Sequence, residues 1–219
     1  VNESYEKFGV NHHGEIRFGL GAIKGMGDSA ALAIIDEREK NGPYKDIFDF
    51  AQRVSFSSVN RKAYESLALS GGFDSFGIRR EDYFATNTRG EMFLDTLVRY
   101  GQTYQSEKEQ MQNSLFGGFD EVEIARPPIP KTEERWSDIE LLNKERDLVG
   151  IYLSAHPLDE YKIILDNMCN AKCADLADVQ QLQGREDVCL GGIVTNVRIS
   201  RDKRGNPCGF VTIEDFEGS

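Results

Sequence analysis

Three of the six prolines in this chain stand within four positions, in the run Arg126-Pro-Pro-Ile-Pro130. A proline has no backbone N–H to donate and biases the residue before it away from helical geometry, so no regular helix passes through this run. The preceding run Leu115-Phe116-Gly117-Gly118-Phe119 places large apolar side chains beside glycines. We therefore predict an extended linker over residues 117–135, with differently organised regions on either side.

The chain begins with a pattern typical of a short β-hairpin. Residues 5–10 and 15–20 are compatible with strands and flank the turn Asn11-His-His-Gly14. A glycine-rich turn, Gly19-Leu-Gly-Ala-Ile-Lys-Gly-Met-Gly27, follows directly. The hairpin is therefore expected to lead into a tight turn, in which glycines allow a backbone path that residues with a Cβ would obstruct.

Helices are predicted beyond this turn. Asp28 and Ser29 are good N-cap residues for the first helix, and Asn41-Gly42-Pro43 ends it. Ser57-Ser58 is expected to cap a later helix. The apolar residues of that later helix lie on one stripe and are Val59, Ala63 and Leu67.

The spacing Gly25-x-Gly27-x-x-x-Ala31-x-x-Ile34 is similar to the helix-hairpin-helix motif, which binds the DNA backbone without regard to sequence. Glycines let a phosphate approach the backbone closely, and amides at a helix N-terminus hold an anion without cationic side chains. The candidate DNA-binding residues of this turn are Lys24, Gly25, Met26, Gly27, Asp28 and Ser29. A tight turn between helices with no ligand is the alternative.

A second candidate motif is Gln112-Asn-Ser-Leu-Phe116. Adjacent Leu115 and Phe116 in a glycine-flanked loop can enter an apolar pocket of a partner, and the Gln112 amide can bond at its rim. This run resembles the pentapeptide with which bacterial replication proteins hold the sliding β clamp, although the family has an apolar residue in place of Asn113. The alternative is a loop that packs on its own core.

The C-terminal region is predicted to change from helices to strands. Ser137-Asp-Ile-Glu140 forms a capping box that opens a helix through about Val149, and further helices are expected near 159–168 and 174–182. Strands are expected from Val188 onward. They flank a turn with a basic set of residues, namely Arg198, Arg201, Lys203 and Arg204. On an incomplete oligonucleotide-binding (OB) barrel these residues would suit single-stranded DNA, and a solvated charged turn explains them equally well.

The charge of the chain is unevenly distributed. The net charge is -11, but residues 1–100 hold 13 Lys and Arg against 15 Asp and Glu, which leaves -9 for residues 101–219. The net charge therefore argues against a chain that coats nucleic acid by bulk electrostatics, whereas the nearly neutral N-terminal region can still form a local DNA site.

Several function classes are excluded at this stage. The four cysteines, at 169, 173, 189 and 208, do not make a disulfide framework or a zinc site, so free thiols are expected. No catalytic constellation, metal site or cofactor site is recognised. No apolar run suits a membrane span and no signal peptide is recognised at the N-terminus, which predicts an intracellular, cytoplasmic protein.

Several short runs occur in an order that resembles the family of bacterial DNA polymerase III alpha subunits. Beside the motifs above, the runs are Val1-Asn-Glu-Ser4, Gly14-Glu-Ile-Arg-Phe-Gly-Leu-Gly-Ala-Ile-Lys-Gly25, Ser70-Gly-Gly-Phe-Asp74, Leu153-Ser-Ala-His-Pro-Leu158 and Gly209-Phe-Val-Thr-Ile-Glu-Asp215. The resemblance covers essentially the whole chain. It implies a fragment of a much larger protein.

The resemblance implies an α+β, predominantly helical fold. The implied segments are the end of the fingers domain at 1–20, a tandem helix-hairpin-helix region at 21–116 with a clamp-binding loop at 112–116, the linker at 117–135, a helical connector at 136–184 and the start of a truncated OB-fold domain at 185–219. The second hairpin of the family is degenerate, which agrees with the absence of a Gly-x-Gly from Val59-Asn-Arg-Lys62. Its candidate DNA contacts are Asn60, Arg61 and Lys62.

The function implied by the resemblance is non-catalytic work in DNA replication. The parent would be a DNA-directed DNA polymerase, a nucleotidyltransferase whose catalytic aspartates and divalent metal lie in a palm domain upstream of Val1. The fragment is expected to be inactive alone and to need no cofactor. Its expected partners are duplex DNA, the sliding β clamp, single-stranded DNA and other replicase subunits, and no membrane. The alternative is a stand-alone interaction module whose Leu-Phe loop docks an unrelated partner.

Overall fold

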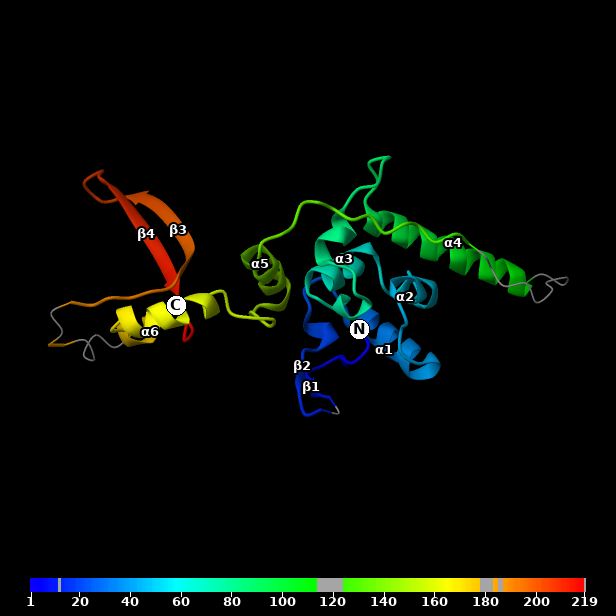
Figure 1. Ribbon diagram of the computed structural model, residues 1–219, viewed down its shortest axis with the longest axis horizontal. Helices are drawn as coiled ribbons and strands as arrows, with labels where there is room; N and C mark the ends of the chain where they lie inside the picture. The colour runs from blue at the N-terminus through cyan, green and yellow to red at the C-terminus, as the bar shows by residue number, and fades with distance from the viewer. Residues whose placement is uncertain (12, 114–123, 178–182, 185–186, 219) are drawn as a thin grey trace. The chain divides into compact units, whose positions relative to one another are not determined.

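The computed structural model describes residues 1–11, 13–113, 124–177, 183–184 and 187–218 (Figure 1). The chain divides into two compact units, Val1–Tyr152 and Leu153–Ser219. Helices dominate the described residues, and two small antiparallel sheets accompany them, so the fold is α+β as predicted.

Unit 1 begins with a two-stranded hairpin. Strand β1 (Gly9–Val10) pairs with β2 (Ile16–Arg17), as the alternating pattern predicts. The paired segment is much shorter than expected, and Ile16 is 78% exposed. Leu20, the last apolar residue of the expected strand, is buried in a 3₁₀ helix rather than in the strand. The hairpin therefore adds little to the core.

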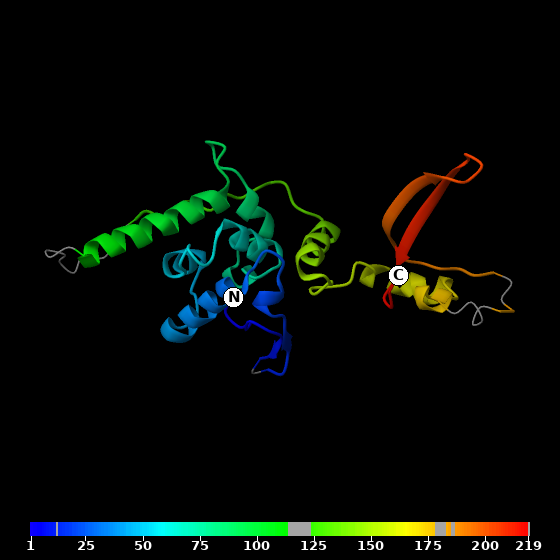
Figure 2. The same cartoon turned by 180° about the vertical axis from the view of Figure 1, so that it is seen from behind.

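The remaining elements of unit 1 are helical. They are the 3₁₀ helix η1 (Leu20–Ala22), α1 (Asp28–Asn41), α2 (Ile47–Arg53), α3 (Arg61–Leu69), the 3₁₀ helices η2 (Asp74–Phe76) and η3 (Arg80–Phe84), α4 (Phe93–Asn113) and α5 (Asp138–Val149). Figure 1 and the reverse view in Figure 2 show α4 as the long helix of this unit. In both views the segment 124–137 runs back along α4.

Two of the predicted helix starts are wrong. Helix α1 begins at Asp28, so its N-cap is Gly27, with no side-chain cap bond, rather than Asp28 or Ser29. Helix α3 is capped by Asn60, whose side chain accepts a bond from the N–H of Ala63 at 3.0 Å, rather than by Ser57-Ser58. The serines are instead part of a turn that closes before the helix, in which the N–H of Ser58 donates to the carbonyl oxygen of Ser55.

The core of unit 1 is built from the predicted helical stripes and a group of aromatic rings. Val59, Ala63 and Leu67 are all buried on one face of α3, as predicted. Edge-to-face and tilted ring contacts join α2 to α3 and to the chain beyond it, and the rings are those of Phe50, Tyr64, Phe73, Tyr83 and Phe93. This packing holds the N-terminus of α3 and the glycine-rich turn in one rigid framework.

The predicted capping box of α5 is present in full. The Ser137 side chain accepts from the Glu140 N–H, and the Glu140 carboxylate accepts from the Ser137 N–H at 2.8 Å. Residues 136–184, expected as one helical connector, are distributed over both units because the division falls after Tyr152.

Unit 2 contains short helices and one long hairpin. The elements are η4 (Asp159–Tyr161), α6 (Lys162–Met168), η5 (Cys173–Ala177), β3 (Ile193–Arg201) and β4 (Pro207–Glu214). Strands β3 and β4 are antiparallel, with an irregularity between Val194 and Asn196. The helix expected at 174–182 is a 3₁₀ helix as far as Ala177, and residues 178–182 lie outside the described residues. Within the described residues, no helix is both long and apolar enough to span a membrane.

Candidate nucleic-acid interface

Two buried apolar side chains anchor the glycine-rich turn between η1 and α1. Ile23 and Met26 are buried, whereas Lys24, Gly25 and Gly27 are exposed. The N–H of Met26 donates to the carbonyl oxygen of Ile23 at 2.9 Å, which closes the turn. Met26, one of the predicted DNA-contacting residues, is therefore an anchor of the turn whose side chain lies in the core.

The two glycines of the motif serve different purposes. Gly25 has a φ of +90°, and a Cβ there would lie 2.7 Å from the Ser66 hydroxyl oxygen. Gly27 has an extended backbone, and a Cβ there would meet no atom closer than the Ser29 hydroxyl oxygen at 3.9 Å. Gly25 is therefore required by the fold, while Gly27 leaves open space beside the N-terminus of α1.

The structure brings the second predicted DNA-contacting group next to the first. The Ser66 hydroxyl of α3 donates to the carbonyl oxygen of Lys24 at 3.0 Å. A Cβ on Gly25 would lie 3.5 Å from the Lys62 side chain. The exposed Lys62 therefore lies beside the turn that carries the exposed Lys24, although only the fold brings these two parts of the sequence together.

Lys62 and Arg61 differ in their availability to a ligand. The Lys62 side chain is 62% exposed, and the Glu65 carboxylate lies 3.7 Å from its ammonium. Arg61 bonds Asp95 at 2.6 Å and Glu65 at 3.0 Å. The hydrogen bond to Asp95 is the main cause that raises the pKa of Arg61 above its ordinary value. Arg61 is thus engaged within the protein, and Asn60 is engaged in capping α3.

Helix α5 also contacts the turn, which the sequence pattern did not predict. The N–H of Lys24 donates to the carbonyl oxygen of Leu148, in the last turn of α5, at 2.9 Å. The Glu145 carboxylate on the same helix is 2% exposed and lies 3.6 Å from the Arg80 guanidinium. Nothing local marks Glu145 in the sequence, because a single acid on an amphipathic helix is typical of a solvated face.

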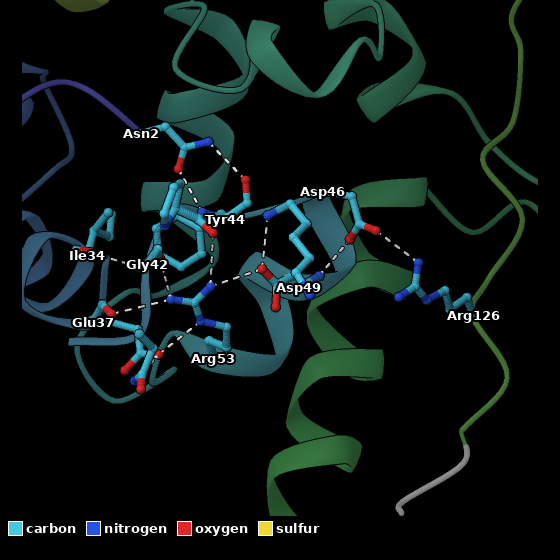
Figure 3. A network of polar contacts seen from close by, with 12 residues as sticks. Asn2, Ile34, Glu37, Gly42, Tyr44, Asp46, Asp49, Arg53 and Arg126 are labelled. Carbon is cyan, nitrogen blue, oxygen red and sulfur yellow. Dashed lines mark hydrogen bonds and ion pairs between the residues drawn. The ribbon is translucent and has the colours of Figure 1, made fainter. Parts of the chain in front are cut away.

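An arginine network fixes α1 against α2. The Arg53 guanidinium bonds the Glu37 and Asp49 carboxylates, each at 3.0 Å, and the carbonyl oxygen of Gly42 at 2.7 Å (Figure 3). Figure 3 also shows Arg126, from the segment after α4, bonded to Asp46 at the start of α2. The Arg53 bonds join α1 and its C-cap to α2 and so help to orient α1, which begins at the glycine-rich turn.

The basic hairpin lies in unit 2, so the structure describes it separately from the glycine-rich turn. The Asp202 carboxylate accepts the N–H groups of Arg204 and Asn206, each at 2.8 Å, and so shapes the tip. The predicted set of cations is exposed on this hairpin and consists of Arg198, Arg201, Lys203 and Arg204. The Arg198 guanidinium lies over the Phe210 ring, 5.1 Å from its centroid, and this ring is itself exposed.

The clamp-binding prediction falls largely outside the described residues. The backbone of Gln112 belongs to the last turn of α4, but its side chain is not described, and Leu115 and Phe116 lie beyond the described part. Within the described part of the chain, no group of three or more His, Cys, Asp or Glu side chains is arranged to hold a metal ion.

The chain resembles known proteins in two respects. A helix-hairpin-helix motif model matches residues 1–83. Over its whole length the chain is 35% identical to the DNA polymerase III subunit alpha of Borreliella burgdorferi and 32% identical to those of Pasteurella multocida and Haemophilus influenzae. It spans 18% of the length of each of these relatives. The chain therefore belongs to the DNA polymerase III alpha subunit family and corresponds to one segment of that large subunit.

Proposed function

We propose that this segment binds the backbone of duplex DNA, without regard to sequence, as part of a bacterial replicative DNA polymerase. The observation that carries the proposal is the open space at Gly27, with the exposed Lys24 in the same turn and Lys62 beside Gly25 of that turn. The similarity of residues 1–83 to a helix-hairpin-helix model and the polymerase relatives support it.

The chemistry of this surface favours a phosphate. The first N–H groups of a helix have no intrahelical acceptor, and they carry the positive end of the helix dipole. At the start of α1, Gly27 carries no side chain, and the nearest atom to a Cβ there would be the Ser29 hydroxyl oxygen at 3.9 Å, so residue 27 itself does not block an anion. The carboxylate of Asp28, in the first turn of α1, repels a phosphate. Phosphate binding therefore depends on the lysines to offset the negative charge of Asp28.

Two substitutions separate an effect on DNA binding from an effect on folding. Each is expected to change the affinity for DNA and the stability of α1 in opposite directions. Gly27→Asp supplies an N-cap carboxylate, which stabilises α1 by roughly a few tenths of a kcal/mol, yet places a negative charge where the phosphate approaches. Asp28→Asn removes a carboxylate that favours the helix start and also repels DNA. We expect weaker duplex binding for Gly27→Asp and tighter binding for Asp28→Asn, measured by fluorescence anisotropy.

The lysines provide a matched series. Lys24→Ala and Lys62→Ala should each weaken binding equally on duplexes of unrelated sequence and lower the salt slope by about one. Lys40→Ala, at the opposite end of α1, removes an equally exposed charge and should change nothing. If Lys40→Ala weakens binding as much as Lys24→Ala, the interaction is diffuse electrostatics. If the unmodified chain ignores DNA, the turn is purely structural.

We further propose that residues 112–116 tether the segment to the sliding β clamp. The described residues on both sides of 114–123 are anchored in unit 1, because α4 extends to Asn113 and Arg126 is bonded to Asp46, the N-cap residue of α2. A modest clamp affinity beside a DNA contact keeps an enzyme on its template by effective concentration. A Leu115→Ala, Phe116→Ala double variant should lose clamp binding and keep duplex binding. Unchanged clamp binding would remove the tether from the proposal.

The β3–β4 hairpin is proposed as the beginning of an OB-type domain. Apolar side chains stay exposed on it, including Val194, Val197 and Ile199, which is expected of strands whose partners lie elsewhere. The Arg198 and Phe210 pair would offer a cation and a stacking surface to single-stranded DNA. Phe210→Ala should weaken oligo-dT binding and leave duplex binding unchanged. Equal losses would argue against a separate single-strand site.

A further inference from the structure

Two cysteines of unit 2, far apart in sequence, are held side by side by the backbone. Cys169 follows the last residue of α6, and Cys189 lies in the segment that leads to β3. The N–H of Asn170 donates to the carbonyl oxygen of Cys189 at 3.1 Å. The N–H of Cys189 donates back to the Asn170 side-chain oxygen at 2.8 Å. This reciprocal pair aligns the two chain segments directly beside both thiols.

The backbone bonds place the two cysteines next to each other. The N–H of Ala171 also donates to the carbonyl oxygen of Cys189, at 3.3 Å. Gly191 provides the room, because a Cβ at that position would come within 2.8 Å of the Cys169 sulfur. Cys189 is exposed, whereas Cys169 is partly covered. The two sulfurs therefore differ in access to a reagent while remaining adjacent to each other.

We propose that Cys169 and Cys189 form a reversible intramolecular disulfide when the protein meets a peroxide. The exposed Cys189 thiol loses its proton, and the thiolate sulfur attacks one oxygen of hydrogen peroxide and breaks the O–O bond. Cys189 becomes a sulfenic acid, and the hydroxide that leaves combines with the released proton to form water. The Cys169 sulfur then attacks the sulfenic sulfur and expels a second water. Two thiols are oxidised, one peroxide is reduced to two waters, and a dithiol reductant reverses the change.

The surroundings of each thiol agree with this order of events. Desolvation is the main cause that raises the pKa of Cys169, and the neighbouring Cys189 raises it further. A smaller fraction of Cys169 is therefore present as the thiolate at neutral pH. The remaining cysteines are placed elsewhere. Cys173 is buried with its thiol directed at the carbonyl oxygen of Ile213, and Cys208 lies on β4 opposite Ser200. The disulfide would join the end of α6 covalently to the segment entering β3.

The test is a disulfide map of the 219-residue chain treated with equimolar hydrogen peroxide, digested without reductant and analysed by mass spectrometry. We expect one dominant cross-linked peptide, joining Cys169 to Cys189, that dithiothreitol removes. The same treatment in guanidinium should give mixed pairings, because the native contact is lost. Four unmodified thiols, dimers linked between chains, or a dominant Cys169–Cys173 bond would each overturn the proposal.

Variants identify the thiol that reacts first. Cys189→Ser should abolish the cross-link and slow peroxide consumption several-fold. Cys169→Ser should leave a sulfenic acid on Cys189 that dimedone traps. Cys208→Ser is the matched control, and it should form the Cys169–Cys189 bond at the rate of the unmodified chain. Loss of the bond in Cys208→Ser would assign the chemistry to a different pair.

Discussion

The backbone N–H of Lys24 donates to the carbonyl oxygen of Leu148 at 2.9 Å, so the last turn of α5 is bonded directly to the glycine-rich turn. A helix leaves its final carbonyls without intrahelical partners, and here the proposed DNA-binding turn supplies one of the missing donors. Helix α5 and the turn thus stabilise each other.

Release of α5 should expose the Lys24 amide. Glu145→Lys replaces a carboxylate that is 2% exposed and faces Arg80 with a like charge, and breaking a buried ion pair costs about 3–5 kcal/mol. We expect the Lys24 amide to exchange with solvent at least roughly tenfold faster by hydrogen-exchange NMR. Asp147→Lys makes the same charge change on the exposed face of α5 and should leave this amide protected. Equal exchange in both variants would show that Glu145 does not hold α5.

The glycines of the turn should respond differently to the same substitution. Gly25→Ala forces a side chain into a φ of +90° and against Ser66, which should cost about 1–3 kcal/mol of unfolding free energy. Gly27→Ala meets open space in an extended conformation and should cost less than about 1 kcal/mol. Urea unfolding measures both, and similar losses would contradict the assignment of separate roles.

Arg53 should contribute far more to stability than a surface arginine. Its side chain is 17% exposed and bonds two carboxylates as well as the Gly42 carbonyl, so Arg53→Met should cost about 2–4 kcal/mol in urea unfolding. Arg99, 63% exposed and paired with Glu91, is the matched control, and Arg99→Met should cost less than about 1 kcal/mol. A small loss for Arg53→Met would mean that aromatic packing alone orients α1.

Asp215 should make unit 2 sensitive to acid. Burial pushes its pKa up, but the N–H groups of Cys173 and Glu217 outweigh burial and hold the pKa below the ordinary value. A carboxylate whose pKa is lower in the folded state stabilises the fold fully above the unfolded pKa of about 3.9. This contribution is lost as the pH falls through the lower folded value.

The Asp215→Asn variant isolates this effect. The melting temperature of the unmodified chain should exceed that of Asp215→Asn near neutral pH, and the difference should shrink as the pH is lowered through the acid range. A difference that stays constant with pH would show that the carboxylate charge is not what matters at this position.

The features that could be predicted from the sequence are those whose partners are neighbours along the chain. The capping box at Ser137 and Glu140, the helix end at Gly42 and the buried stripe of α3 depend on spacings of a few residues, and all are present. The glycine pattern that begins at Gly25 was sufficient to indicate the helix-hairpin-helix motif, which the family model also finds.

The two wrong predictions concern which of several neighbouring residues caps the N-terminus of a helix. Asp28 and Ser57 were as plausible caps as Gly27 and Asn60 by residue type alone. Which residue becomes the cap depends on where the chain must bend to pack its helices, and propensity does not contain that information. The exposure of Ile16 was also not predictable from the local pattern. Alternation of apolar and polar residues predicts a strand, but it does not tell whether another element covers the apolar face of that strand.

The sequence by itself determined the local elements, the glycine-rich turn and the family, because hydrogen bonds within a turn and helical periodicity act over a few residues. Only the tertiary structure decided that Lys62 lies beside Gly25, that Leu148 accepts from Lys24, and that the chain at Cys169 and Asn170 pairs with Cys189. Such contacts join segments whose separation along the chain is unrelated to their separation in space, and they form only when the apolar faces of distant elements pack together.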